Sequence, residues 1–296
     1  MRPRFGIGIL VIAALTSPSF AVFAQKPRSR TITVSIVNAS NQPVQDLTSA
    51  DLQLKENGVT RTITALKFAQ PMRIIMFVDN SDPTAPATNP LRAGVTQFID
   101  AIPPEHELML MTISRNLQVR VQPTMDHKRM TDGAKLIFGE SNAPSVLFNG
   151  LQEAFTRFAR DVKDRWLIFM VVTFNGPENS NLNPKQLEQF VDALRARPVV
   201  VYGVNVTPRG PAVQTTVLTH LAESTGGAIE TISIPTALPD KMKTIADRIV
   251  RDYSPLSTQY VLTYESDRSE GQGASIELAV AREGVRSSVG AGWGLR

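Results

Sequence analysis

The stretch RIIMFVDNSDP, residues 73 to 83, joins an apolar run to a cluster of oxygen-bearing side chains. Residues 73–78 are almost continuously apolar, which is typical of a strand that is buried on both faces of a sheet. Asp79, Ser81 and Asp82 follow directly. In open α/β sheets, ligands bind beyond the carboxyl ends of the strands. The stretch therefore predicts a buried parallel strand with a candidate binding loop at its end.

Three more apolar runs follow, with helical patterns between them. The runs are ELMLMTI (107–113), RWLIFMVVTF (165–174) and VVVYGVNV (199–206). The helical patterns cover residues 89–102, 145–162, 183–196, 216–227 and 240–253. Two of them open on Asn-Pro, at Asn89-Pro90 and Asn183-Pro184, which suits an N-cap followed by proline at the first helical position. This alternation predicts an α/β fold, a doubly wound, mostly parallel sheet with helices on both faces.

Strand patterns return at both ends of the chain. Residues 31–68 contain alternating runs and an Asn57-Gly58 hairpin signal, and residues 259–293 again read as strands with turns between them. We expect the two ends to form one small β-module. A length of 296 residues allows one large or two small domains. The expected division is 25–70 and 256–296 for the module, with 71–255 for the α/β domain.

The first 24 residues have the pattern of a signal peptide. Arg2 and Arg4 precede an apolar stretch that is short for a bilayer span, and SPSFAVFAQ offers cleavage after Ala21 or after Ala24. The alternative is an N-terminal membrane anchor. No second apolar stretch of about 20 residues follows. We therefore expect an exported protein, periplasmic or secreted, without stable membrane insertion after cleavage.

Composition excludes several classes of function. The chain has no cysteine, so disulfides, thiolate metal sites and a cysteine nucleophile are absent. Without Arg2 and Arg4, 29 Lys and Arg oppose 27 Asp and Glu, a balance of +2. The basic residues are scattered, whereas nucleic-acid binding usually needs a basic face. We expect no nucleic-acid partner.

Motifs of enzymes are also missing. The three histidines, His106, His127 and His220, form no HExxH pair, and we expect each at the surface or at a helix end. No GxSxG precedes a helix, and no glycine-rich loop ends in Gly-Lys-Ser/Thr. A Ser, His and Asp set that only folding assembles stays open as the enzyme alternative.

The order of these segments resembles a known family. VNASNQPVQDLTSADLQLKENGVTRTITALKF (37–68) is similar to the region before the A domain of exported bacterial "VWFA-related" proteins, and STQYVLTYES (257–266) is similar to their closing strand. The chain between them resembles a von Willebrand factor A (VWA) domain. The resemblance covers nearly the whole chain after the signal, and it implies a VWA or Rossmann-like fold.

The resemblance also implies a metal-ion-dependent adhesion site (MIDAS), with Asp-x-Ser-x-Ser, a threonine and an aspartate on three loops. Asp79 and Ser81 match the first two positions, and Pro83 stands where the second serine belongs. Ser145 replaces the threonine and keeps a hydroxyl, while Asn175 replaces the aspartate and loses its charge. Mg²⁺ takes oxygen ligands and needs charge compensation. We therefore expect a vestigial metal site.

Three hypotheses follow for the function. The first is an exported, non-enzymatic protein-binding or adhesion module with a degenerate MIDAS, no cofactor and an unidentified protein partner. The second is a Mg²⁺-dependent adhesion module, in which Asp82 is the substitute ligand. The third is an enzyme of unrecognised type. The sequence leaves the oligomeric state open.

Overall fold

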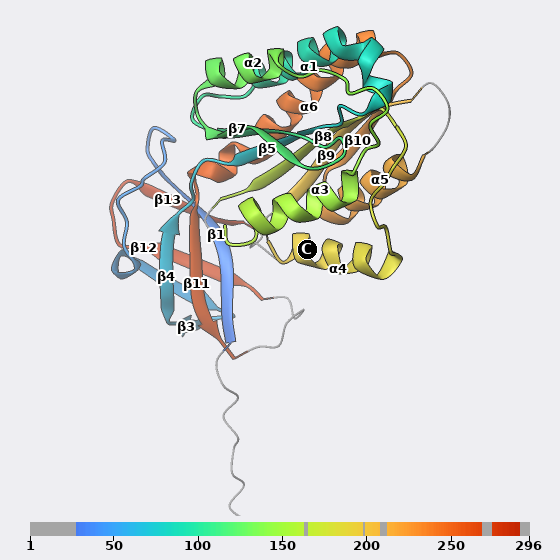
Figure 1. Cartoon of the computed structure of the whole chain (residues 1–296). Coiled ribbons are helices and arrows are strands. Elements are labelled where there is room, and N and C mark those ends of the chain that lie inside the picture. Colours follow the sequence, from blue (N-terminus) through green and yellow to red (C-terminus); the bar gives the residue numbers. More distant parts are fainter. Residues whose placement is uncertain (1–27, 163–164, 198, 208–211, 268–273, 291–296) are drawn as a thin grey trace, which may run out of the picture.

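A computed structural model describes residues 28–162, 165–197, 199–207, 212–267 and 274–290 (Figure 1). The expected signal peptide, residues 1–24, and both cleavage points, Ala21 and Ala24, lie outside the described residues. Within the described ranges, no helix is both long enough and apolar enough to cross a membrane.

A central mixed sheet confirms the predicted fold class. In the described chain its order is β10-β9-β8-β5-β6-β7, parallel throughout except for the antiparallel pair β6-β7. Its strands are β5 (Arg73–Val78), β6 (Glu107–Thr112), β7 (Gln118–Thr124), β8 (Leu167–Thr173), β9 (Val199–Val206) and β10 (Ala228–Ile232). The predicted apolar runs form β5, β6, β8 and β9, which lie side by side in the middle of the sheet.

Helices cover both faces of this sheet, and each face has its own core. The helices are α1 (Thr88–Ala101), α2 (His127–Lys135), α3 (Leu147–Ala154), α4 (Pro184–Arg195), α5 (Val213–Thr225) and α6 (Leu238–Tyr253). Figure 1 shows α1, α2 and α6 above the sheet and α3, α4 and α5 below it. Side chains of β5 alternate, so that Ile74 and Met76 join the first core while Ile75 and Phe77 join the second.

Some of the helix boundaries follow local signals. Asn183 caps α4 by accepting a hydrogen bond from the Lys185 N–H, and α5 ends at Gly226 with φ 80°. The prediction that α1 begins at Asn89-Pro90 was wrong by two residues. A 3₁₀ segment, Asp82–Ala87, leads directly into α1, which begins at Thr88. The preceding turn therefore fixes the start of this helix, and the Asn-Pro pair lies inside it.

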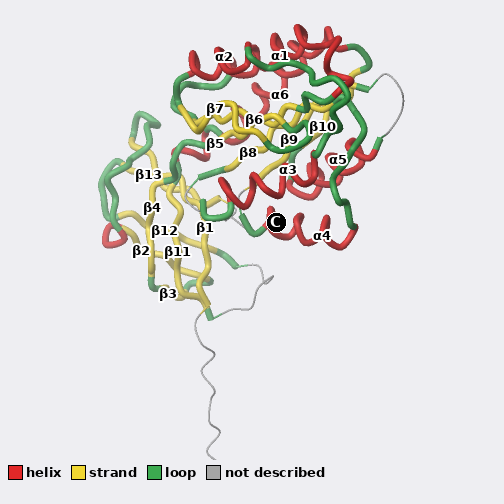
Figure 2. Tube along the Cα trace, viewed as in Figure 1, coloured by secondary structure: helices red, strands yellow, loops and turns green. Residues whose placement is uncertain are grey.

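Strands from both ends of the chain form the predicted β-module. One sheet has the order β13-β1-β11-β4 and a second has the order β12-β2-β3. The bounds are β1 (Arg28–Asn38), β2 (Leu52–Glu56), β3 (Val59–Arg61), β4 (Ile63–Phe68), β11 (Tyr260–Ser266), β12 (Ile276–Val280) and β13 (Val285–Gly290). Asn57 and Gly58 have φ values of 50° and 79° and turn the β2–β3 hairpin. Figure 2 shows this strand-rich module beside the α/β unit.

His106 differs from its prediction as a surface or helix-end residue. It lies directly before β6 with 1% of its surface exposed, and its Nε2 is 2.9 Å from the Ser254 hydroxyl just beyond α6. Its Nδ1 is buried and has no hydrogen-bond partner in the described chain. Burial lowers the pKa of this imidazole, while the nearby Glu105 charge raises it. The His106 N–H donates to the Pro103 carbonyl, and this turn places the ring at the end of α6.

Two connecting segments join the α/β unit to the β-module, and they lie beside each other. Residues 69–72 lead from β4 into β5, and residues 254–259 lead from α6 into β11. The two connections touch, because the Ala69 N–H donates to the Gln259 carbonyl over 2.7 Å. Both therefore lie at the amino end of β5, opposite the end that carries Asp79.

Candidate functional site

The first loop of the candidate site continues β5 and then turns sharply. Asp79 N–H donates to the Val172 carbonyl over 2.8 Å, which extends the pairing of β5 with β8. Asp79 Oδ1 then accepts a hydrogen bond of 3.0 Å from the Ser81 N–H. Thr84 Oγ1 donates to the Asp79 carbonyl over 2.8 Å. These side chain to backbone bonds form the turn typical of Asp after a strand, and they fix the direction of Ser81.

The other two loops are hydrogen-bonded to the first loop or to each other. Asp82 N–H donates to the Ala143 carbonyl of the second loop over 3.0 Å. Ser145 N–H in turn donates to the Pro177 carbonyl of the third loop over 2.8 Å, and the Ser145 carbonyl accepts from Asn179 over 2.8 Å. The loops that carry the sequence-predicted residues therefore meet at the carboxyl edge of the sheet.

A glycine permits the closest approach between the first and third loops. A Cβ atom added to Gly176 would lie 2.7 Å from Ser81 Oγ and 3.0 Å from Pro83 Cδ. Real Cβ contacts essentially never fall below 3.0 Å, so a larger residue would push the two loops apart. Gly176 follows Asn175 directly, which places the third-loop candidate next to Ser81 and Pro83.

Two hydroxyls of the site are buried without a partner. Asp79, Ser81 and Ser145 are each 0% exposed. The hydroxyls of Ser81 and Ser145 have no hydrogen-bond partner among the described residues. A buried hydroxyl without a partner costs free energy, so it marks a position at which a ligand atom can bond.

The Asp79 carboxyl has a partner on each oxygen and no cation beside it. Oδ1 accepts from the Ser81 N–H, and Oδ2 lies 2.9 Å from the Thr173 hydroxyl. No ion pair of Asp79 is recorded in the described chain. Burial raises the pKa of this carboxyl, and hydrogen bonds from Ser81, Thr173 and the Phe174 backbone act against that rise.

The remaining sequence-predicted residues face other partners. Asn175 has φ 53°, and its Oδ1 accepts a hydrogen bond of 3.0 Å from the Thr215 hydroxyl. Its Nδ2 is buried and has no partner in the described chain. Asp82 is exposed, and its Oδ1 accepts from the Asn142 N–H over 2.8 Å. In this structure the Asp82 carboxylate therefore fastens the second loop.

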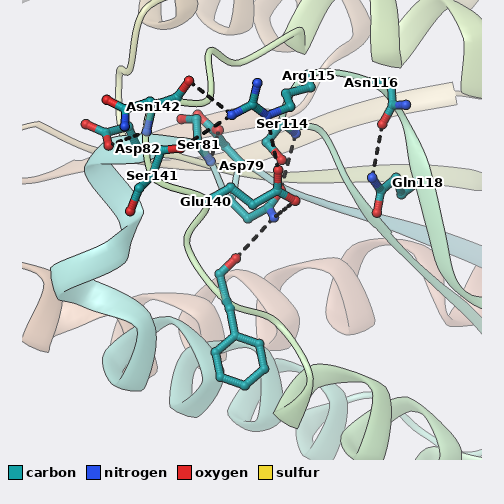
Figure 3. A network of polar contacts seen from close by, with 12 residues as sticks. Asp79, Ser81, Asp82, Ser114, Arg115, Asn116, Gln118, Glu140, Ser141 and Asn142 are labelled. Atoms are coloured by element: carbon teal, nitrogen blue, oxygen red, sulfur yellow. Dashed lines mark hydrogen bonds and ion pairs between the residues drawn. The ribbon is translucent and has the colours of Figure 1, made fainter.

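Arg115 fixes the second loop from its other side. Its guanidinium donates to the Asn142 carbonyl over 3.2 Å and lies 3.6 Å from the Glu140 carboxylate. Figure 3 shows Arg115 beside the loop residues Glu140 and Asn142, with Asp82 next to Asn142. Asp82 and Arg115 therefore bond to the same loop residue, Asn142, one through its N–H and the other through its carbonyl.

Three residues at this edge were not singled out from the sequence. Thr173 ends β8, Gln214 lies in the first turn of α5 with 1% exposure, and Glu178 is on the third loop. Gln214 Nε2 donates to Glu178 Oε2 over 3.0 Å, and Gln214 Oε1 contacts the Thr173 hydroxyl. Spacing along the chain gives no signal for Gln214, because it reaches the site from a distant helix. Thr173 and Glu178 could have been noticed in the sequence, because Thr173 directly precedes the third loop and Glu178 lies on it.

Comparison with known proteins identifies the fold. No protein-family model matches the sequence, and no curated protein matches it. The structure of a von Willebrand factor type A protein from Catenulispora acidiphila is similar over 92% of this chain and 74% of that chain, with a TM-score of 0.51 and 9% identity. The chain has a von Willebrand factor A fold. At 9% identity, the likeness concerns the fold alone.

Two other VWA structures match with lower scores. The proximal thread matrix protein 1 from the mussel byssus, with a zinc-occupied MIDAS motif, has a TM-score of 0.49 and 13% identity over 69% of this chain. This chain covers 50% of that mussel protein, or about half of its length. The SpRpn10 VWA domain has a TM-score of 0.45 and 17% identity, over 57% of this chain and 93% of that domain. The fold assignment rests on the Catenulispora structure.

The VWA fold raises the question whether these residues fit a metal ion. The Ser81 and Ser145 hydroxyls fit, because they are buried and lack partners. The other positions do not fit: Pro83 has no side-chain oxygen, and the free group of Asn175 is an amide nitrogen, which has no lone pair to offer. In the described chain, no three His, Cys, Asp or Glu residues lie together so that they could hold a metal. Compared with the ligand set that the resemblance implies, this edge keeps one carboxyl and two hydroxyls and lacks the second serine and the second carboxylate.

Proposed function

We propose that this chain is a non-enzymatic protein-binding module that works without a metal ion. Its binding face is the edge of the VWA sheet where the three loops meet. The observation that carries the proposal is the donor set of that edge. Asp79 is the one carboxyl among the matched positions, Asn175 directs its carbonyl oxygen to Thr215, and the loops are fastened to one another by backbone hydrogen bonds. The edge is therefore preformed, as is common for binding sites.

Exposed apolar side chains beside this edge support a protein partner. Leu136 and Phe138, which precede the second loop, are 68% and 60% exposed. The Phe138 carbonyl accepts a hydrogen bond of 3.1 Å from Asn80 Nδ2, and the Arg92 guanidinium lies 4.1 Å from the centre of its ring. The Phe138 ring is thus held at the surface against Arg92 of α1, while its backbone carbonyl is bonded to Asn80, the neighbour of Ser81. Aromatic and arginine side chains are enriched in the centres of protein interfaces.

The second candidate is Mg²⁺-dependent adhesion, and the unpartnered hydroxyls of Ser81 and Ser145 favour it. Calorimetry with Mg²⁺ and Mn²⁺ separates the two candidates, because metal-free binding predicts no heat of binding at millimolar ion.

We further propose export to the periplasm or the outside, on the pattern of residues 1–24. The division into a binding domain, 71–255, and a module of 25–70 and 256–296 is proposed with it.

Capture from the exported protein fraction tests the proposal. The immobilised chain is compared with a Leu136→Ser, Phe138→Ser variant, and a Val59→Ser variant serves as the control. Val59 is 53% exposed but lies on β3 of the β-module. We expect the parent and the control to retain the same protein in EDTA, and the double variant to lose it. Retention only with Mg²⁺ supports the second candidate, and equal retention by the parent and both variants contradicts this face.

A further inference from the structure

Basic and apolar side chains adjoin one another from the end of α2 to the second loop. Lys135 is the last residue of α2, and the exposed Leu136 and Phe138 follow it. On α1, the Arg92 guanidinium lies 4.1 Å from the centre of the Phe138 ring. Cations of two helices therefore flank the two apolar side chains that the proposed binding face presents.

Asn80 connects these groups to two further arginines. Its Nδ2 lies 3.1 Å from the Phe138 carbonyl and 3.2 Å from Glu140 Oε1. The Glu140 carboxylate is in turn shared by the guanidiniums of Arg115 and Arg120, at 3.6 and 3.9 Å. We call this surface the basic strip, and it consists of Arg92, Arg115, Arg120, Lys135, Leu136 and Phe138.

Positive charges outnumber the acids along the basic strip. On α2, the Asp132 carboxylate is shared by Lys128 and Lys135, just as Glu140 is shared by two arginines. Asp82, a third acid beside the second loop, accepts a hydrogen bond from a backbone N–H. These three acids stand against five cations, which are Arg92, Arg115, Arg120, Lys128 and Lys135. The surplus is two positive charges.

Arg92 is the cation with the poorest compensation. In the part of the chain that the structure describes, no carboxylate lies within ion-pair distance of it, and its buried Nη2 has no hydrogen-bond partner. Its Nε donates to the Ile137 carbonyl over 2.8 Å, which holds the guanidinium in place over the Phe138 ring. A cation that is fixed but not neutralised favours an anionic group of a partner beside it.

We propose that the basic strip binds an acidic segment of the protein partner, in which Asp or Glu side chains accompany an apolar residue. The apolar residue packs against Leu136 and Phe138, and the carboxylates pair with the surplus cations. Guanidinium groups suit this role because they bind carboxylates through two parallel hydrogen bonds. The inference deepens the proposed function and rests on its choice of this face. None of the six strip residues occupies a position matched to the metal site.

An anionic lipid surface would also be attracted by positive charge, but the packing of α2 favours a protein. Met130 and Ala134, the apolar residues of this helix, are buried in the core. Helices that lie in a membrane surface turn their apolar face to the lipid. Since α2 turns that face inwards, two apolar side chains remain outside, which suits the small apolar centre of a protein interface.

Selection from a random peptide library in EDTA tests the proposal. We expect the chain to enrich peptides in which Asp or Glu stands next to an apolar residue. Arg115→Gln with Lys135→Gln should bind these peptides about tenfold more weakly. Both side chains are more than half exposed, at 57% and 65%, so the variant should still fold. Added salt should weaken binding to the parent, because it screens exposed charges.

Two control variants separate local charge from other effects. Arg115→Lys with Lys135→Arg exchanges the two side chains and keeps both charges, so it should bind as the parent does. Lys67→Gln with Lys185→Gln removes two charges at exposed positions of β4 and α4, far along the chain from the strip. It should also bind as the parent does. Equal weakening by this second control would assign the effect to net charge and overturn the inference.

The Leu136→Ser, Phe138→Ser variant distinguishes the two possible failures. If it binds the enriched peptides as well as the parent does, this face is not the binding face and the proposed function fails. If it loses them but they carry no excess of Asp and Glu, the proposed function stands and the acidic partner is wrong. Sedimentation of the parent with phosphatidylglycerol vesicles, and not with phosphatidylcholine vesicles, would assign the strip to an anionic membrane instead. A library without any enriched peptide would equally overturn the inference.

Discussion

Tyr264 on β11 donates its hydroxyl to the Glu56 carboxylate on β2 over 3.1 Å, and both residues are buried. The bond joins the two sheets of the β-module and connects segments that are 208 residues apart. Ser266 donates to the same carboxylate over 2.8 Å, and Arg61 Nε lies 3.1 Å from it. The first and last parts of the chain are therefore bonded through one buried acid.

Removing this hydroxyl should weaken the β-module. Tyr264→Phe keeps the ring and removes one donor from Glu56, and hydrogen bonds to charged groups contribute about 1.5 to 3 kcal/mol. We expect a loss of that size in the free energy of unfolding, measured with urea. Lys67→Ala, at an exposed position of β4, serves as the control and should change stability by less than about 0.5 kcal/mol. An equal effect of the two variants would show that the Glu56 bond is not structural.

Deleting residues 256–296 should release the N-terminal strands. β11 pairs with β1 and with β4 on its two sides, so its loss exposes both strands. Unpaired strand edges are open to proteases and to aggregation. We expect limited proteolysis to cut within residues 28–68 of the truncated chain and not of the parent. Protection of that region after truncation would show that the two ends fold independently.

Charges in the central strands should unfold the α/β unit. Met76 on β5 and Phe169 on β8 are 0% exposed and lie in the middle of the sheet. Met76→Lys or Phe169→Asp buries an unpaired charge, which costs about 3 to 5 kcal/mol. Thermal melting should fall steeply for both, while Lys185→Asp on the exposed start of α4 should melt close to the parent. Unchanged melting of the buried-site variants would contradict the sheet.

Restoring the family's ligands should create a response to Mg²⁺. Pro83→Ser with Asn175→Asp returns a hydroxyl and a charge to the first and third loops, and each change alone should help less. The parent should show little change in melting with millimolar Mg²⁺. The double variant should gain about 1.4 kcal/mol when the ion is in tenfold excess over its Kd. A folded double variant without any gain would mean that these loops do not form a metal site.

His106 should make stability depend on pH. Because burial lowers its pKa in the folded state below 6.5, the unfolded chain takes up the proton first as the pH falls. The free energy of unfolding should therefore fall from about pH 6.5 downwards and level off below the folded-state pKa. His106→Gln keeps a donor for Ser254 and should flatten this part of the curve. The same slope in both proteins would assign the effect to other groups.

The sequence predicted the centre of the sheet better than its edges. β5 and β9 have the predicted bounds, because strands buried on both faces are apolar throughout. β7 and β10 lie at the two edges and are only partly buried, so their residues form no apolar run and the pattern did not indicate them.

The candidate site shows a similar division. Asp79 and Ser81 could be found because they follow a recognisable strand. Ser145 and Asn175 could be found because the family resemblance points to their positions. Gln214 could not, since folding alone brings α5 to Glu178. The orientation of Asn175 towards Thr215 likewise depends on a tertiary contact.

The position of β5 has a mechanical consequence. Its amino end follows one of the two adjoining connections to the β-module, and its carboxyl end carries Asp79, six residues or about 20 Å away. A pull between a ligand held at that edge and an anchored β-module would therefore run along β5 and, through the second connection, into α6. β5 is paired in parallel with β6 and β8, so this load would strain two rows of hydrogen bonds in shear, all at once. The tension that follows β5 would reach the bound edge through the centre of the sheet.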